Sequence, residues 1–317
     1  MASEPQQLDT PILFLIFNRP DTTRLVFEKI RQVRPEKLFV AADGPREGIA
    51  SDKERCAGAR RIVELIDWPC ELHTLFQEKN NGAGLGSVKA IDWFFEHVEE
   101  GIILEDDDVP DLSFFRFCSD LLARYRDDDK VMMVSGDNFL FDRKKIHESY
   151  YFSIYPMQWG WATWRRAWKK YDYKISTLPD FIAKDTISSV LQQPIKKKYW
   201  MGVFQKMYGG TRKDAWDYQW AYAMWRNGGL CAMPSRNLVS NIGYSKDATH
   251  TTDTESRLAN VPASEMVFPL VHPTMKEPDR KADDLLFYTY YGRNLTLERR
   301  TKDQVRKILK RYLKINI

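Results

Sequence analysis

Short apolar runs alternate with longer amphipathic stretches through the first half of the chain. Each run is bounded by Gly, Pro, Asn or Asp, a pattern typical of strands buried on both faces of a parallel sheet. We expect strands at residues 10–17, 37–42, 71–77, 101–104 and 131–136, and helices at 22–33, 52–66, 87–97 and 113–125. This alternation predicts an α/β fold with a mixed, mostly parallel sheet flanked by helices.

Aromatic side chains dominate residues 150–168, where the strand and helix alternation is interrupted. Within this segment Trp161, Trp164 and Trp168 recur at helical spacing, which predicts a helical stripe facing the core. Trp159 precedes that stripe, and together with Trp161 it is our candidate platform for a sugar ring. Core packing is the alternative for these rings.

The pattern weakens beyond the aromatic segment. Residues 172–210 are basic and poorly periodic, and Lys196–Lys198 are interpreted as a solvated surface. A helix at 214–226 is followed by Gly-Gly, which favours a helix end there. A short strand and a turn are expected within 230–243. We therefore expect one large domain whose C-terminal part is elaborated.

Four consecutive carboxylates follow the apolar run at 101–104, and they are the strongest chemical signal in the chain. They are Glu105, Asp106, Asp107 and Asp108. In open α/β sheets the carboxyl ends of the strands are where ligands bind. Crowded carboxylates repel one another unless a cation neutralises them, and oxygen ligands favour Mg²⁺ or Mn²⁺. The alternative is an acidic turn whose Asp111 caps the helix at 113–125.

Polar residues also follow the first two expected strands. Arg19 follows the first strand and Asp43 the second, so both should lie at one edge of the sheet. They are interpreted as contacts to a base or ribose, and the alternative is an ion pair between them. Asn81 and Gly82 belong to a glycine-rich turn at 80–86 whose amides would approach a phosphate or sugar, although its spacing matches neither the dinucleotide fingerprint nor the P-loop.

Two further side chains in the second half are candidates for chemistry. Asp217 lies in the first turn of the helix at 214–226, where it would serve as a base or would simply favour the helix dipole. His250 stands among Ala, Thr and Asp in a loop, and it would complete a metal shell, contact a diphosphate or act as a structural residue.

Composition narrows the class of protein. The chain has 317 residues, 43% of them hydrophobic, with a net charge of +4 and no apolar run long enough to span a bilayer. So slight a charge excludes nucleic acid as the expected partner. The N-terminus lacks the features of a signal peptide, and the four cysteines have no zinc or disulfide spacing, so a cytoplasmic location is expected. A basic amphipathic helix at 298–317 would dock on the domain or touch the inner face of a membrane.

These motifs together resemble the GT-A fold nucleotide-sugar glycosyltransferases, and in particular bacterial relatives of the inverting N-acetylglucosaminyltransferase I group. The resemblance covers about residues 11–243. The matching elements are Phe17-Asn-Arg-Pro20, Asp43-Gly44, Glu105-Asp106-Asp107, Ser135-Gly136, Trp159-Gly-Trp161 and Trp216-Asp217. Asp108 departs from the pattern as a fourth acid.

The resemblance implies a domain at 1–245, with a nucleotide-binding half at about 10–110 and an acceptor half at about 111–245, and an extension at 246–317. It further implies the following roles: nucleotide contacts for Arg19, Asp43 and Asp106, metal ligation by Asp107, and base catalysis by Asp217. We add Asn81, Gly82 and Glu105 to the nucleotide-sugar contacts, and His250 to the metal ligands.

The sequence therefore predicts a metal-dependent inverting glycosyltransferase that uses Mn²⁺ or Mg²⁺. Its donor would be a nucleotide sugar, expected to be a UDP-sugar, and its acceptor a glycan or lipid-linked glycan in bacterial surface polysaccharide synthesis. One alternative is a sugar nucleotidyltransferase, although that class carries a glycine-rich, basic loop where this chain has Asn18-Arg-Pro20. Another is a non-catalytic glycan-binding protein with a structural metal.

Overall fold

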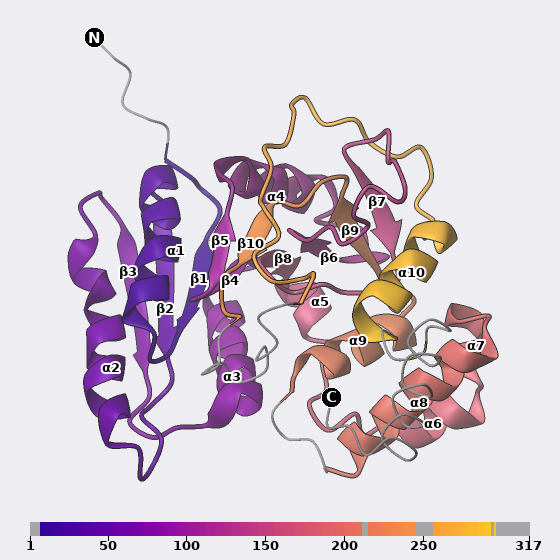
Figure 1. Ribbon diagram of the computed structural model, residues 1–317, viewed down its shortest axis with the longest axis horizontal. Helices are drawn as coiled ribbons and strands as arrows, with labels where there is room; N and C mark the ends of the chain where they lie inside the picture. Colours follow the sequence, from indigo (N-terminus) through magenta and orange to yellow (C-terminus); the bar gives the residue numbers. More distant parts are fainter. Residues whose placement is uncertain (1–6, 211–214, 245–255, 293–294, 296–317) are drawn as a thin grey trace, which may run out of the picture.

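The protein is built on one eight-stranded sheet with helices on both sides (Figure 1). The computed structural model describes residues 7–210, 215–244, 256–292 and 295. The strand order is β3-β2-β1-β4-β8-β6-β9-β7, and a second sheet pairs β10 with β5. Four of the pairings in the large sheet are parallel and three are antiparallel. The prediction of an α/β fold with a mixed, mostly parallel sheet is thus confirmed.

The elements of the first half follow the expected alternation closely. They are β1 (Ile12–Ile16), α1 (Pro20–Val33), β2 (Lys37–Ala42), α2 (Ala50–Arg60), a 3-10 turn (Arg61–Leu65), β3 (Glu71–Phe76), α3 (Gly82–His97), β4 (Glu100–Glu105), β5 (Asp108–Pro110), α4 (Leu112–Arg124) and β6 (Val131–Ser135). Helix α1 packs against α2 and α4, while α3 packs against β1 and α5.

The register of the parallel strands brings their carboxyl ends together. Strand β1 lies between β2 and β4, with Ile16 opposite Ala42 and Leu15 opposite Glu105. Every residue of β1 is buried, because both faces of the strand are covered by helices. The residues that follow these strands therefore emerge at one edge of the sheet.

The second half completes the sheet and adds a helical layer. Its elements are β7 (Tyr150–Ser153), β8 (Trp161–Trp164), α5 (Arg165–Trp168), α6 (Leu178–Ala183), α7 (Thr186–Val190), α8 (Pro194–Tyr208), α9 (Asp217–Arg226), β9 (Leu230–Pro234), β10 (Val239–Asn241), α10 (Arg280–Leu286) and a π-helical turn (Phe287–Tyr291). Helices α6, α7 and α8 gather at one end of the molecule, at the lower right of Figure 1.

The predicted helical stripe through Trp161, Trp164 and Trp168 is wrong. Trp161–Trp164 is strand β8, which runs antiparallel between β4 and β6, and only Trp168 belongs to a helix. Both tryptophans of the strand are 1% exposed. A strand covered on both faces needs no alternation of polar and apolar residues, so the spacing of its tryptophans was not informative.

Residues 172–210, which are basic and poorly periodic in sequence, form helices α6, α7 and α8. Helix α8 buries Trp200, Phe204 and Met207 against the rest of the molecule. Lys196, predicted to be solvated, is 3% exposed and forms an ion pair with Asp284 of α10. Its ammonium also lies 5.1 Å from the ring centre of Phe287. Contacts made from far along the chain therefore order this segment.

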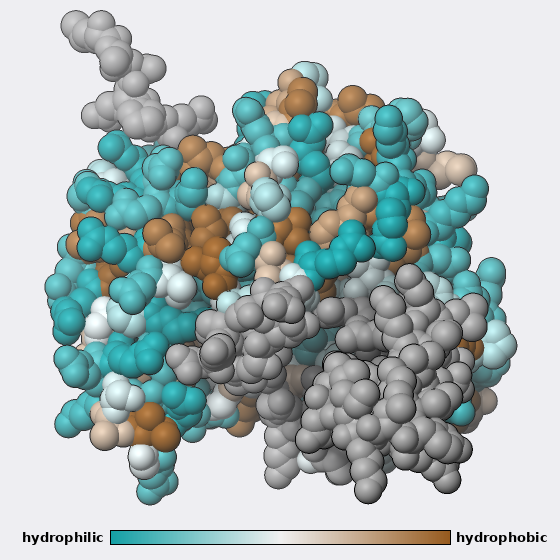
Figure 2. All heavy atoms as spheres, viewed as in Figure 1, coloured by the Kyte–Doolittle hydropathy of each residue, from teal (hydrophilic) through white to brown (hydrophobic). Residues whose placement is uncertain are grey.

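The segment from residue 256 to 292 packs along the second half of the large sheet. Phe152 of β7 forms an isolated bridge with Pro278, and Ser153 Oγ donates to Asp283 of α10 at 2.6 Å. In Figure 2 the described surface is mostly hydrophilic, with apolar side chains in separate patches. Within the described ranges, no helix combines the length and apolarity that crossing a bilayer requires.

Candidate active site

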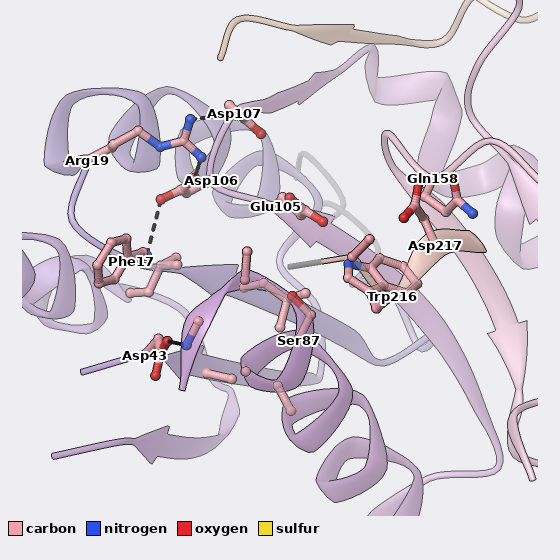
Figure 3. A pocket seen from close by; sticks show the side chains of 18 of the residues that line it. Phe17, Arg19, Asp43, Ser87, Glu105, Asp106, Asp107, Gln158, Trp216 and Asp217 are labelled. Atoms are coloured by element: carbon pink, nitrogen blue, oxygen red, sulfur yellow. Dashed lines mark hydrogen bonds and ion pairs between the residues drawn. The ribbon is translucent and has the colours of Figure 1, made fainter. Parts of the chain in front are cut away.

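A cleft of about 880 Å³ lies at the carboxyl ends of β1, β2 and β4. The first half of the chain supplies one wall of it, and residues of the second half supply the other (Figure 3). Nine of the eleven site residues predicted from sequence line this cleft: Arg19, Asp43, Asn81, Gly82, Glu105, Asp106, Asp107, Trp159 and Asp217. Residues separated by up to about two hundred positions in the chain thus meet in one hollow, as expected for strand ends of an α/β sheet.

Arg19 neutralises two of the four acids at the end of β4. Its guanidinium donates to Asp106 and, at 2.7 Å, to Oδ2 of Asp107. Asp106 also accepts from the backbone N–H of Phe17 at 3.1 Å. Arg19 is therefore held against the carboxylates from the turn after β1, and it borders the cleft as a bridge between two acids (Figure 3).

Asp107 keeps one carboxylate oxygen without a partner. Oδ2 accepts from Arg19, but Oδ1 is buried and has no hydrogen-bond partner among the described residues. Burying an unpaired carboxylate oxygen costs free energy, so such an atom needs a compensating ligand. The close approach of Gly243 confines this carboxylate, because a Cβ there would overlap Oδ2.

The remaining acids of the cluster have structural partners. Asp108 is 1% exposed and accepts from the N–H groups of Glu105 and Gly160 and from Asn241 Nδ2. Asp111 accepts from Ser113 N at 2.9 Å and caps α4, as the alternative interpretation of this turn proposed. The acidic stretch therefore divides into residues facing the cleft and residues that hold the local fold.

Burial and mutual repulsion raise the pKa values of two acids that face the cleft. Loss of water and the charges of Asp107 and Asp106 raise the pKa of Glu105 to about 8, and Asp217 adds to this effect. Burial raises the pKa of Asp106 to about 6, although Arg19 acts in the opposite direction. Carboxylates that resist ionisation in this way are stabilised by a nearby cation, which favours their charged form.

The described residues fit a divalent ion whose coordination is completed by the phosphates of a bound substrate. No group of three or more His, Cys, Asp or Glu side chains in the described ranges is arranged to enclose a metal by itself. Mg²⁺ at phosphate sites, however, is commonly held by one or two carboxylates, with substrate phosphates and water as the other ligands. The buried, partner-free Oδ1 of Asp107 provides one such ligand. His250, the second predicted ligand, lies outside the described residues.

Asp43 is committed to the start of helix α3. Its carboxylate accepts from the N–H groups of Gly44, Asn81 and Gly82 at 2.9 to 3.0 Å, and from the side-chain amide of Asn80 at 3.0 Å. No ion pair joins it to Arg19, so the alternative interpretation of an Arg19–Asp43 pair is wrong. A carboxylate at a helix N-terminus satisfies free amides and the helix dipole.

The glycine-rich turn is mostly part of that helix. Helix α3 begins at Gly82, five positions before the expected start at residue 87. Asn81 and Gly82 line the cleft, but their N–H groups point to Asp43. An incoming phosphate would thus meet a helix N-terminus whose first amides already have an anionic partner.

Asp217 is placed on the opposite wall of the cleft. It is the first residue of α9 and follows Trp216, and in Figure 3 its carboxylate lies across the hollow from Glu105. The charge of Asp217 is one of those that raise the pKa of Glu105, so the two carboxyls share one electrostatic environment. A polar group from the second half of the chain is therefore presented toward the acidic end of β4.

Aromatic rings form much of the second wall. The ring centre of Trp159 lies 5.8 Å from that of Tyr244 and 6.1 Å from that of Tyr290, and all three residues line the cleft. Trp161 does not reach it: the residue is 1% exposed, and its ring stacks at 5.6 Å behind that of Trp216. The prediction that Trp161 contacts an acceptor is therefore wrong, because this side chain belongs to the core.

Several cleft residues were missed in the sequence. Gln158 lies beside Asp217 in Figure 3, and its Nε2 is buried without a hydrogen-bond partner among the described residues. It stands next to Trp159 in the aromatic segment, so proximity to that candidate was an available signal. Tyr290 comes from the expected extension, and nothing in its local sequence placed it at the cleft. The predicted helix at 298–317 lies outside the described residues.

Comparisons with known proteins are distant. No protein-family model and no curated protein matches the chain. Among solved structures it is similar to S. aureus TarS 1–349, with 11% identity and a TM-score of 0.42, over 73% of this chain and 59% of that chain. It is also similar to the inositol-1-phosphate CTP transferase from T. maritima, with 8% identity and a TM-score of 0.39, over 79% of this chain and 94% of that chain.

A third similar structure is HddC from Yersinia pseudotuberculosis, with 9% identity and a TM-score of 0.32, over 54% of this chain and 86% of that chain. The chain spans less than two thirds of the length of the TarS structure. These TM-scores are too low to assign a family or an activity, so the interpretation of the cleft depends on its own residues.

Proposed function

We propose that this protein is a metal-dependent inverting glycosyltransferase that moves a sugar from a nucleotide-diphosphate donor to a hydroxyl group. One observation carries the proposal: a single cleft brings the partner-free, buried oxygen of Asp107 together with Asp217 on the opposite wall. The first suits a cation that binds a diphosphate, and the second suits a base for the acceptor. A UDP-sugar is the proposed donor.

The acidic wall would handle the leaving group. A Mg²⁺ or Mn²⁺ ion held by Asp107 would neutralise the charge that develops on the departing nucleoside diphosphate. Arg19, which now bridges Asp106 and Asp107, is a second cation beside the same position. Asp43 would act indirectly, since it fixes the start of α3 along the donor side of the cleft.

The aromatic wall would handle the acceptor. Asp217 would take the proton of the acceptor hydroxyl while that oxygen bonds to the anomeric carbon, and the bond from this carbon to the donor phosphate breaks. Attack from the side opposite the leaving group inverts the configuration, and no covalent enzyme intermediate is needed. Trp159 would stack on the acceptor sugar and orient its hydroxyl.

We further propose a glycan or glycolipid of bacterial surface polysaccharide as the acceptor. This reaction would take place in the cytoplasm, at the inner face of the membrane. Contact with the membrane would come from the basic amphipathic helix predicted at 298–317. These assignments come from the sequence, and they are tested separately from the chemistry of the cleft.

Nucleotide binding is the first test. Isothermal titration with UDP and GDP should show binding that depends on Mn²⁺, with UDP preferred. Asp107→Ala should lose the metal-dependent part, whereas Asp120→Ala on the exposed side of α4 should retain it. Full metal-dependent affinity in Asp107→Ala would exclude Asp107 as a ligand. A glycan-binding protein with a structural metal should bind neither nucleotide.

Turnover is the second test. Asp217→Asn should lose transfer and donor hydrolysis by a factor of about 100 or more and keep its affinity for UDP, because general base catalysis is worth about 10²–10⁴. Asp180→Asn, which also changes an acid in the first turn of a helix, is the matched control. Unimpaired turnover in Asp217→Asn would remove its assignment as base. Release of pyrophosphate from a nucleoside triphosphate and a sugar phosphate would instead identify a nucleotidyltransferase.

A further inference from the structure

A row of aromatic rings leads away from the second wall of the cleft. The ring centre of Phe139 lies 5.0 Å from that of Trp159 and 5.8 Å from that of Tyr290, and Phe139 and Tyr290 are nearly parallel. Phe141 continues the row, with its ring centre 6.4 Å from that of Phe139. Trp159 and Tyr290 line the cleft, whereas Phe139 is 0% exposed, so the row is a packed link through the interior between the cleft and the turn at Phe141.

Two arginines lie at the outer end of this row. The guanidinium of Arg257 is 4.8 Å from the ring centre of Phe141. Arg143 belongs to the same turn as Phe141, and it donates to Leu140 O at 3.2 Å and to the hydroxyl of Thr289. Among the described residues neither arginine forms an ion pair with a carboxylate.

The two guanidinium groups are close enough to repel one another. Partial burial lowers the pKa of Arg143, and the charge of Arg257 lowers it further, with no carboxylate acting in the other direction. Like charges held together without a counter-ion raise the free energy of the protein, and an anion between them would lower it. Geometry and charge thus agree on an anion.

The turn that carries Arg143 is held in a strained backbone conformation. Phe141 and Asp142 have φ angles of 49° and 58°, in the left-handed region that side chains other than glycine rarely adopt. Such conformations are unfavourable for residues other than glycine and persist where the surrounding structure fixes them. Here the bond from Arg143 N to Leu140 O and the packing of Phe141 fix the turn.

A basic hollow of about 510 Å³ adjoins Arg143. Lys144, Lys281, Asp284 and Leu285 also line it. Asp284 is engaged by the buried Lys196, and Lys144 pairs with Asp279 at 2.7 Å. Arg143, Arg257 and Lys281 therefore remain as cations that no carboxylate of the described ranges neutralises by an ion pair, and we refer to these three as the basic cluster.

We propose that the basic cluster binds a phosphate group carried by the acceptor, whose sugar would lie in the cleft beside Trp159. This inference rests on the proposed function where it identifies the phosphate as part of the acceptor. The binding of an anion does not depend on that function. Guanidinium groups present paired donors that match phosphate oxygens, and two of them bind the anion more tightly than ammonium groups do. The phosphate could belong to a lipid headgroup or to a soluble sugar phosphate.

The test uses the full-length protein and two probes. Sedimentation with vesicles of phosphatidylcholine, with and without phosphatidylglycerol, measures recognition of a lipid phosphate. Calorimetry with a hexose 6-phosphate, in the presence of saturating UDP and Mn²⁺, measures recognition of a soluble one. The variants are Arg143→Ala with Arg257→Ala, and Arg257→Ala with Lys281→Ala. The second pair removes no hydrogen bond that holds the turn. The control is Lys145→Ala, which removes an exposed cation two positions from Arg143 in the chain.

We expect the unmodified protein to bind one of the two probes, and both double variants to lose about tenfold or more in affinity, because each loses two of the charged groups that would bind the phosphate. Lys145→Ala should bind the probe as tightly as the unmodified protein does, and every variant should keep its affinity for UDP. Binding of neither probe, or an equal loss in Lys145→Ala, would overturn the proposal. If the unmodified protein does not bind UDP, the proposed function is contradicted. The anion site would then be decided by measuring probe binding in the absence of nucleotide.

Discussion

The two walls of the cleft are built in different ways. The wall from the first half of the chain consists of charged side chains at the ends of neighbouring strands, and these are tied to internal partners, as Arg19 is to Asp106 and Asp107. Much of the other wall consists of rings that come from distant segments, such as Trp159 and Tyr290, whose ring centres lie 6.1 Å apart, and Asp217 is the carboxylate on this side. Charge and fixed geometry characterise the first wall, and shape and apolar surface the second.

This difference indicates how each wall would respond to substitution. Hydrogen-bonded charges act as a unit, so that removing one leaves the others unpaired and costs more than the lost contact. The ring pairs of the second wall are edge-to-face, and such pairs contribute more independently, at about 0.5–1.5 kcal/mol for each pair. Four changes test this comparison: three alter the cleft and are taken from the largest expected effect to the smallest, and the fourth lies outside the cleft.

Gly243→Ala should have the largest effect on the charged wall. The added Cβ would overlap Oδ2 of Asp107 and lie 3.0 Å from Nη1 of Arg19, so the carboxylate must move. We expect the affinity for UDP in the presence of metal to fall by about a hundredfold. Overpacking costs about 1–3 kcal/mol, and here it displaces Asp107, the proposed metal ligand. Gly202→Ala, where a Cβ meets nothing within 4 Å, is the control. Unchanged UDP affinity in Gly243→Ala would show that the position of Asp107 does not matter.

Asp43→Ala should weaken the same wall through its architecture. The change leaves the amides of Asn81 and Gly82 without their acceptor at the start of α3. We expect the free energy of unfolding to fall by about 2 kcal/mol, measured by urea denaturation, together with a weaker affinity for UDP. The stability of Asp43→Asn should lie between that of Asp43→Ala and that of the unmodified protein. An altered UDP affinity with unchanged stability would instead indicate direct contact between Asp43 and the nucleotide.

Trp159→Ala should act on the aromatic wall alone. Loss of the ring removes contacts to Tyr244 and Tyr290 and the surface for an acceptor sugar. We expect KM for the acceptor to rise by about tenfold, with the affinity for UDP unchanged. Trp159→Phe should restore most of the affinity because it keeps a ring at this position. A change confined to UDP affinity would assign Trp159 to the donor side.

Asp283→Asn should change stability with pH and leave the cleft intact. Burial raises the pKa of Asp283 to about 7, so the folded protein holds a proton that the unfolded chain releases near pH 4. Stability is then present at low pH and is lost as pH rises toward 7 and above. The variant should be the more stable protein at pH 8, by roughly 1–3 kcal/mol, and the difference should vanish near pH 4. A difference in melting temperature between the two proteins that stays constant from pH 4 to pH 8 would contradict this prediction.

The charged wall was largely predictable from the sequence. Acids and an arginine directly after apolar strands must lie at one edge once the strands are parallel neighbours, and this rule places Arg19, Asp43 and Asp107 correctly. It does not supply their partners. The engagement of Asp43 with the start of α3 depends on where that helix begins, and glycines gave no clear indication of that point.

The aromatic wall was predictable only in part. Trp159 and Trp161 have the same local signals, yet one borders the cleft and the other lies in the core, because β8 is covered on both faces. Tyr290 reaches the cleft through contacts formed by a segment far along the chain, and helix α8 is ordered in the same way. Periodicity reports the environment of a segment and not which distant segments supply it.

Strand β8 joins the two walls from below. Because it is hydrogen-bonded to β4 on one side and to β6 on the other, a single continuous sheet underlies the whole cleft. Rotating the walls toward each other as rigid bodies would break this ladder and expose its buried tryptophans to water. Enclosure of a substrate is therefore left to the segments above the sheet, and the spacing between the two walls is a fixed property of the fold.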